Sequence, residues 1–152
     1  MEKTGTGNRR AAAKLRAART ALLIAVVFTA LNIALFLFGG ATYLLFSLNL
    51  PYFAVVLGAL YGMIPAGALV AALLLVIFIL LYLLCDKHVG FLIAVTALVA
   101  VDTTLLAVVC LASHDLRGVL DGIIHVWMLY MLIAAVRAYD RPDDASAWPE
   151  NY

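Results

Sequence analysis

Four stretches of this sequence are each long and apolar enough to cross a lipid bilayer as an α-helix. They cover residues 21–38, 65–85, 89–112 and 116–138. The shortest gives a helix of about 27 Å, which is close to the hydrocarbon thickness of a membrane. The chain is 66% hydrophobic and 12% charged, whereas soluble domains are about half apolar and about a quarter charged. The sequence therefore predicts an all-α membrane protein of one domain with four transmembrane helices.

The stretch 42–62, between the first two spans, is apolar but is interrupted by Ser47, Asn49 and Pro51. If it crossed the membrane, the chain would have five spans, and its basic residues would be divided between the two sides. With four spans, nine of the ten Lys and Arg residues lie on one side, so the positive-inside rule favours four spans. Asn49 can cap a helix that has Pro51 in its first turn. We therefore expect a short re-entrant or interfacial helix from Asn49 to Tyr61.

Charge is distributed unevenly along the chain, and this predicts the orientation. Six of the ten Lys and Arg residues lie in the first nineteen residues, and the last thirteen hold four acids and one Arg. The basic segment 1–20, with a helix over 9–19 that continues into the membrane, and the acidic tail 139–152 are both expected in the cytoplasm. The basic helix is expected to contact anionic lipid. It lacks the aromatic residues typical of nucleic-acid sites, so no nucleic-acid partner is expected.

Ionisable side chains occur inside the last two spans, with Asp102 in the third and Asp121 and His125 in the fourth. A carboxylate at the centre of a transmembrane helix costs about 2.5 to 3.5 kcal/mol on insertion scales, so it normally faces a partner or a cavity. Asp121 and His125 share one helix face because they are four residues apart. The helical rise places Asp102, His125 and Asn32 about 15, about 13 and about 10 Å from the outer ends of their spans. These four residues are predicted to form a polar site in the outer half of the bundle.

The fourth span also has a predicted helix-packing motif. Gly118 and Gly122 flank Asp121 and form a small-xxx-small pair, which would let a neighbouring helix approach closely. Because four short helices enclose little volume, we also expect a homo-oligomer or a larger membrane complex.

Three functions are compatible with the predicted polar site. The first is a transporter or channel-like protein in which Asp102, Asp121 and His125 exchange protons or bind a cation or small substrate. The second is a non-catalytic accessory or structural subunit, in which the same residues join the helices by hydrogen bonds. The third is a metal-dependent enzyme with these residues as ligands, although one histidine and two carboxylates are a weak pattern beside His-rich zinc sites. The sequence specifies neither a cofactor nor a metal, and we adopt the transporter or channel-like function as the leading hypothesis.

Three motifs resemble an unannotated family of small four-span bacterial membrane proteins. They are Thr42 to Ser47 (TYLLFS), Pro51-Tyr52, and His125 to Tyr130 (HVWMLY). The resemblance extends from the first span through the fourth. It implies the four-span topology and a location in the bacterial cytoplasmic membrane, and it implies no particular activity.

Overall fold

The computed structural model describes residues 4–40, 43–113 and 116–139, and these residues form five α-helices and no strands. Four of the helices contain a window long and apolar enough to cross a membrane, and the second helix, of 12 residues, is too short to do so. The all-α prediction with a short helix between the first two spans is confirmed. The helices are α1 (Thr4–Leu37), α2 (Asn49–Leu60), α3 (Ile64–Leu84), α4 (Val89–Ser113) and α5 (Leu116–Tyr139).

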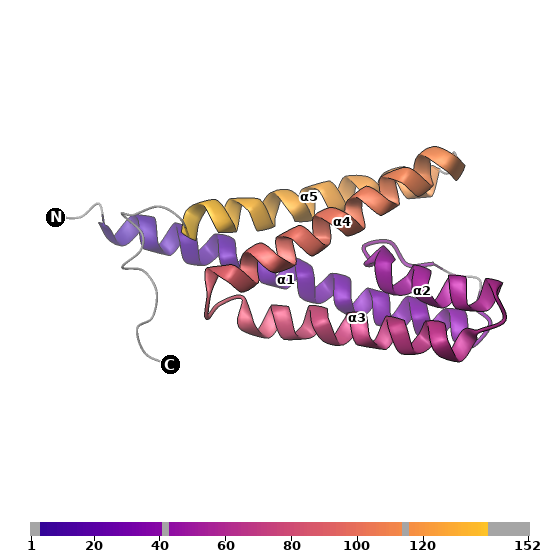
Figure 1. Cartoon of the computed structure of the whole chain (residues 1–152). Coiled ribbons are helices and arrows are strands. Elements are labelled where there is room, and N and C mark those ends of the chain that lie inside the picture. The colour runs from indigo at the N-terminus through magenta and orange to yellow at the C-terminus, as the bar shows by residue number, and fades with distance from the viewer. Residues whose placement is uncertain (1–3, 41–42, 114–115, 140–152) are drawn as a thin grey trace.

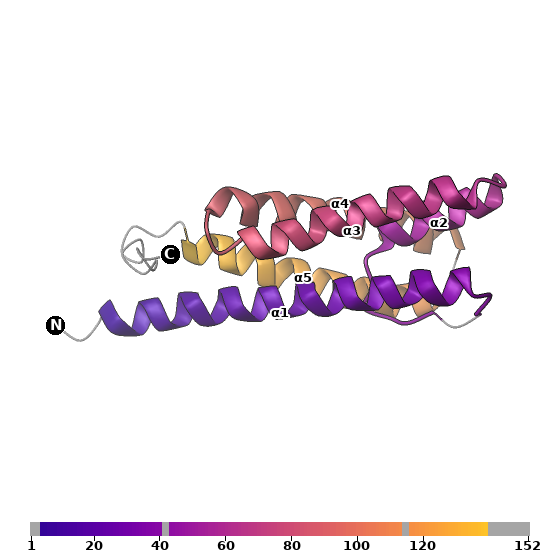
Figure 2. The same cartoon turned by 90° about the horizontal axis from the view of Figure 1, so that it is seen from below.

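The four long helices run alternately up and down beside one another (Figures 1 and 2). α1 begins and α5 ends at one end of the bundle, which we call the N-terminal end. α1 ends and α2 turns into α3 at the opposite end, which we call the far end. α1 and α4 each pack against both α3 and α5, so the long helices form a closed ring. α2 lies in the far half, where it packs against α1, α3 and α4.

The connection from α1 to α2 enters the bundle. Figure 2 shows it running back from the far end towards the middle, where α2 begins, and α2 then runs outward again. Asn49, the first residue of α2, contacts Asp102, which lies near the middle of α4. The short helix is therefore a half-span that starts at mid-depth, with Asn49, Pro51 and Val55 buried and with Leu57 and Leu60, near its end, exposed.

Glycines end α1 and α2 in the same way. Gly39 and Gly62 have φ values of 77° and 69°, in the left-handed region that favours glycine. After α2, the N–H groups of Gly62 and Met63 donate to the carbonyl oxygens of Ala59 and Gly58, which is a Schellman motif. The equivalent bonds follow α1 at Gly39. These turns reverse the chain at the far end.

α2 and α3 form a tight hairpin because two glycines let their backbones touch. A Cβ atom on Gly67 would collide with the carbonyl oxygen of Ala54 and would lie 2.9 Å from the Cα atom of Gly58. A Cβ atom on Gly58 would lie 2.8 Å from the Cα atom of Gly67. Such close backbone approach is typical of small residues between membrane helices.

The outward faces of the long helices are strongly apolar, and the buried residues include a set of polar ones. Large hydrophobic side chains on these faces are more than half exposed, a pattern that suits contact with lipid and would be unusual for a monomer in water. Together with the four spanning helices, this makes the chain a membrane protein. Examples of these exposed residues are Leu69, Leu73, Val101, Val108, Ile123 and Val126.

At the N-terminal end, an ion pair joins α1 to the turn between α3 and α4. Arg19 Nη1 lies 2.7 Å from Asp86 Oδ2. The same guanidinium group lies 4.9 Å from the centre of the Tyr82 ring, within cation–π range. α1 itself begins at Thr4, earlier than the predicted helix over 9–19, and extends beyond the other helices (Figures 1 and 2). Most of the predicted acidic tail, residues 140–152, lies outside the described residues.

Candidate functional site

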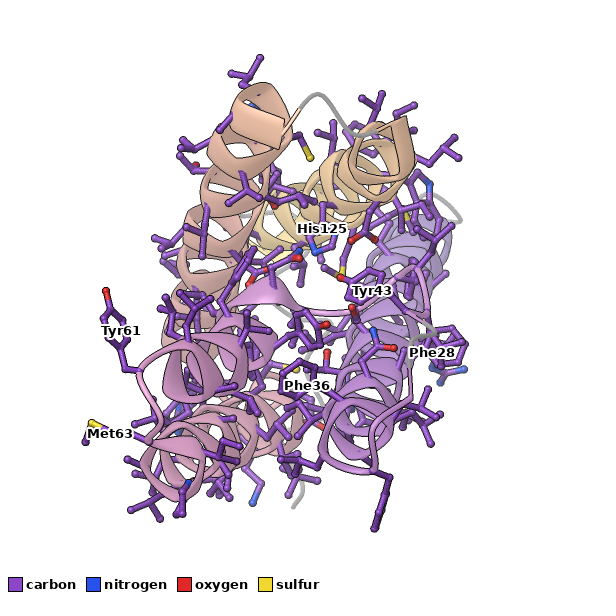
Figure 3. The ribbon with its side chains drawn as sticks, turned by 90° about the vertical axis from the view of Figure 1, so that its right-hand side faces the viewer. Phe28, Phe36, Tyr43, Tyr61, Met63 and His125 are labelled. Atoms are coloured by element: carbon purple, nitrogen blue, oxygen red, sulfur yellow. The ribbon has the colours of Figure 1, made fainter. Side chains whose placement is uncertain are left out.

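Among the side chains that the structure describes, seven buried polar ones gather in the far half of the bundle, and none is more than 3% exposed. Figure 3 views this end and shows His125 and Tyr43 near the centre, whereas Tyr61 and Met63 point outward. Because Tyr43 bonds to several of the seven, we include it and call the whole set the polar cluster. Its members are Thr29, Asn32, Tyr43, Ser47, Asn49, Asp102, Asp121 and His125.

Three of the four predicted site residues lie side by side. His125 Nε2 is 3.1 Å from Asp102 Oδ2, and His125 Nδ1 is 3.6 Å from Asp121 Oδ1. The imidazole ring therefore lies between the two carboxylates, with one at each ring nitrogen. The fourth residue, Asn32, reaches them through Ser47 and Tyr43.

Asn32 binds the backbone of the loop that follows α1. Its side-chain oxygen accepts the N–H of Leu44 at 2.7 Å, and its amide nitrogen donates to the carbonyl oxygen of the same residue at 2.8 Å. The amide nitrogen also donates to Ser47 Oγ at 2.9 Å. Asn32 thus satisfies both backbone groups of one loop residue, as a paired strand would do.

Asp102 binds the first turn of α2. Its Oδ2 and Oδ1 atoms accept the N–H groups of Asn49 and Leu50 at 3.1 and 2.6 Å. Leu48 is the N-cap residue and makes no side-chain cap bond. The prediction that the side chain of Asn49 caps this helix is therefore wrong: a carboxylate from another helix has that role, and Asn49 is the first helical residue.

With this arrangement, all four N–H positions at the start of α2 are accounted for. A helix leaves these groups without an intrahelical partner. The N–H of Leu48 donates to Thr29 Oγ1 at 2.6 Å, Asp102 accepts the next two, and Pro51 has no N–H. Non-helical backbone at membrane depth is tolerated only where it is buried and satisfied in this way.

Asp121 holds the preceding turn of the loop. Its Oδ1 atom accepts the N–H of Phe46 at 2.9 Å, and its Oδ2 atom accepts the hydroxyl of Tyr43 at 3.2 Å. Phe46 has a φ of 70°, which is uncommon for a residue with a side chain. Its ring packs edge-on against Phe28 and lies near Trp127. The carboxylate and the rings together stabilise this strained turn.

Hydroxyl and amide donors connect the remaining members of the cluster. Ser47 Oγ accepts from Asn32 and donates to the Tyr43 hydroxyl at 2.8 Å. That hydroxyl lies 3.2 Å from both Asp121 Oδ2 and Asn49 Oδ1. The bonds therefore run in one direction, from the amide on α1 to the carboxylate on α5.

The two predicted packing glycines have different surroundings. A Cβ atom on Gly118 would collide with Cys110 Sγ of α4, so this glycine lies at the contact between α4 and α5. A Cβ atom on Gly122 would meet no atom within 4 Å. Of these two glycines, Gly118 alone lies at a close approach between helices.

The geometry does not bring metal ligands together. Among the residues that the structure describes, no three His, Cys, Asp or Glu side chains could hold one metal ion. Asp102 and Asp121 lie at opposite nitrogens of the His125 ring, so the three groups do not converge on one point. The arrangement can instead orient backbone amides and hold protons.

Sequence reasoning missed the acceptor role of these side chains towards the loop. Thr29 appeared only as one polar residue in an apolar span, and Ser47 and Asn49 appeared as interruptions of an apolar stretch. The sequence did contain a signal for this role. An interrupted apolar stretch inside a membrane has backbone N–H groups without a partner, and each of them needs an acceptor from a spanning helix.

Comparison with known protein families, curated proteins and solved structures finds no match to this chain.

Proposed function

We propose that this chain is a structural or accessory membrane protein whose polar cluster holds a re-entrant loop inside a four-helix bundle. The observation that supports this most directly is the pair of hydrogen bonds from Asn49 and Leu50 to Asp102. Both carboxylate oxygens accept backbone N–H groups, so the most deeply buried acid serves the fold. This role ranks ahead of the transporter or channel-like role that the sequence favoured.

Amide hydrogen exchange in lipid nanodiscs tests the proposal. The N–H groups of Leu48, Asn49 and Leu50 should exchange as slowly as those of the long helices. Asp102→Ala removes the acceptor of two of them, and an unsatisfied buried donor costs about 1 to 3 kcal/mol. Exchange at Asn49 and Leu50 should therefore rise about tenfold to about a hundredfold.

A matched control keeps the exchange experiment specific. Thr104→Val changes a polar residue on the same helix whose hydroxyl bonds only within α4. It should leave exchange in the loop unchanged. If Asp102→Ala has no more effect than this control, the clamping role of Asp102 is wrong.

Transport is the second candidate, and one specific observation favours it. A chain of hydrogen bonds runs from Asn32 through Ser47 and Tyr43 to Asp121, and His125 joins that residue to Asp102. Chains of carboxylates and imidazoles are common in proton pathways. Proton or cation flux into proteoliposomes tests this role. Flux that Asp102→Asn abolishes supports transport, and flux equal to that of empty liposomes supports the structural role.

The membrane in which the chain lies and its orientation there are also part of the proposal. We propose a bacterial cytoplasmic membrane with both termini in the cytoplasm, based on the basic N-terminal segment and the resemblance described above. Reporter proteins fused to each end test this orientation.

Contact of the basic helix with anionic lipid is supported by the exposed side chains of Lys14 and Arg16. Replacing both with Gln should weaken the preference for anionic over zwitterionic nanodiscs.

A homo-oligomer or a larger membrane complex completes the proposal. An accessory subunit requires a partner, and the outward faces of the helices are apolar enough to accept one in the membrane. Mass measurement of the purified protein in nanodiscs distinguishes a monomer from an oligomer. Co-purification from native membranes, without overexpression, identifies a larger complex.

A further inference from the structure

The surroundings of His125 fix the position of one proton. Nδ1 lies 2.9 Å from the backbone carbonyl oxygen of Asp121 and 3.6 Å from its Oδ1 atom. A carbonyl oxygen can only accept a hydrogen bond, so Nδ1 must carry a proton and donate it. The ring is therefore either the Nδ1–H tautomer or the imidazolium cation.

The other ring nitrogen, Nε2, lies 3.1 Å from Asp102 Oδ2 and 3.3 Å from the amide nitrogen of Asn49. A hydrogen bond from the amide would satisfy Nε2 but would place no proton between Nε2 and Oδ2, so two lone pairs would still face each other there at hydrogen-bond distance. The shorter contact, with the carboxylate, is therefore the one that needs a proton. The proton is either on Nε2, which gives imidazolium and carboxylate, or on Oδ2, which gives neutral imidazole and carboxylic acid. We infer that Asp102 and His125 form a proton-binding site that holds one exchangeable proton between them.

The groups around the pair explain why the proton stays. Asp121 of α5 is the nearest other titratable group, and the Tyr43 hydroxyl of the loop bonds to that same carboxylate. α2 contributes the Asn49 amide, 3.3 Å from Nε2, and α1 contributes only the uncharged Thr29 and Asn32. Losing the shared proton would leave two negative charges in the cluster, and an uncompensated buried charge is costly.

This site also links protons to the re-entrant loop. The inference rests on the proposed function in this respect, because the carboxylate of Asp102 that shares the proton through Oδ2 also accepts the N–H of Asn49 at Oδ2 and the N–H of Leu50 at Oδ1. A further proton on the pair would give imidazolium and carboxylic acid together, so Asp102 would no longer be a carboxylate in either arrangement of the first proton. The bonds to Asn49 and Leu50 would lose their charge assistance, which makes up much of their strength.

Nitrogen-15 NMR of histidine, combined with infrared spectroscopy, tests the inference on the full chain in lipid vesicles. A background with His88→Gln and His114→Gln leaves His125 as the only imidazole. Between about pH 6 and about pH 8, where a free imidazole titrates, we expect Nδ1 to stay protonated. We also expect either imidazolium, or neutral imidazole with a carboxylic acid band that Asp102→Asn removes. Both results support the shared proton.

Two results would overturn it. One is a neutral imidazole with no carboxylic acid band assigned to Asp102, since the pair would then hold no proton. The other is a ring protonated only at Nε2. Thr104→Val is the matched control, because its hydroxyl bonds to Ala100 of its own helix, and it should leave one proton shared between Asp102 and His125. The same samples separate this inference from the proposed function: if Asn49 and Leu50 remain protected from exchange while no shared proton is found, only the proton site is wrong.

Discussion

Asp102 Oδ1 accepts the backbone N–H of Leu50 at 2.6 Å, although the two residues are 52 positions apart in the chain. A short apolar helix that begins inside a membrane has exposed N–H groups, and lipid offers no acceptor for them. The third spanning helix supplies the acceptor. The carboxylate that looks unfavourable in the sequence of α4 is thus the partner that α2 requires.

Replacing Asp102 should destabilise the protein in proportion to the acceptors lost. Asp102→Ala leaves two backbone donors without an acceptor and removes the carboxylate beside His125 Nε2, so we expect a loss of about 3 to 5 kcal/mol in the free energy of unfolding. Asp102→Asn keeps one acceptor oxygen and should cost about 1 to 3 kcal/mol. Denaturant unfolding in mixed micelles measures both. If both variants unfold with the same free energy as the unaltered protein, the hydrogen bonds of Asp102 contribute little to stability.

Thr29→Val should reveal the contribution of the hydroxyl that binds Leu48. Valine has nearly the same shape, so the main change is the unpaired N–H of Leu48, at about 1 to 2 kcal/mol. Thr96→Val is the control, because its hydroxyl bonds only to Leu92 of its own helix. Thermal unfolding in the same detergent compares the two variants. A smaller loss for Thr29→Val than for Thr96→Val would contradict the assignment.

Gly67→Ala should open the hairpin between α2 and α3. Its Cβ atom would meet backbone atoms of Ala54 and Gly58, which cannot move independently of α2, so we expect a loss of about 2 kcal/mol or more. Gly122→Ala places the same methyl group in open space on α5, and helix propensity predicts a gain of about 0.5 to 1 kcal/mol. Unfolding free energies of both variants check the opposite signs. A loss at Gly122 would instead indicate a contact with another chain or with lipid.

The ion pair at the N-terminal end should contribute little. Asp86 is 40% exposed in its side chain, so solvent screens its attraction to Arg19, and Asp86→Asn should cost less than about 1 kcal/mol. Arg19→Gln should cost more, because it also removes the contact with the Tyr82 ring. A double-mutant cycle between Arg19 and Asp86, measured at low and high salt, separates the two effects. A coupling energy that does not fall with salt would contradict a screened pair.

Part of the site was predictable because depth in a membrane follows from helical rise. Counting residues from the span ends predicts the same depth for Asp102 and His125. In the structure, Asp102 Oδ2 lies 3.1 Å from His125 Nε2. Asn32 was also placed in that half of the bundle, but its partners are Leu44 and Ser47 rather than the ionisable residues. Depth in the membrane is only one coordinate of a side chain's position. The partners of a side chain also depend on the rotation of its helix about the helix axis, and packing against neighbouring helices sets that rotation.

The sequence by itself determined that four apolar helices cross a membrane and that the stretch after the first does not, because the hydrophobic length and the charge distribution each permit few alternatives. Only the tertiary structure decided what the buried acids are for. Asp102 and Asp121 accept N–H groups from a loop that is distant in the chain, and such bonds form only once α4 and α5 enclose that loop. An aspartate that would bind a substrate and an aspartate that binds a backbone amide look the same in a sequence.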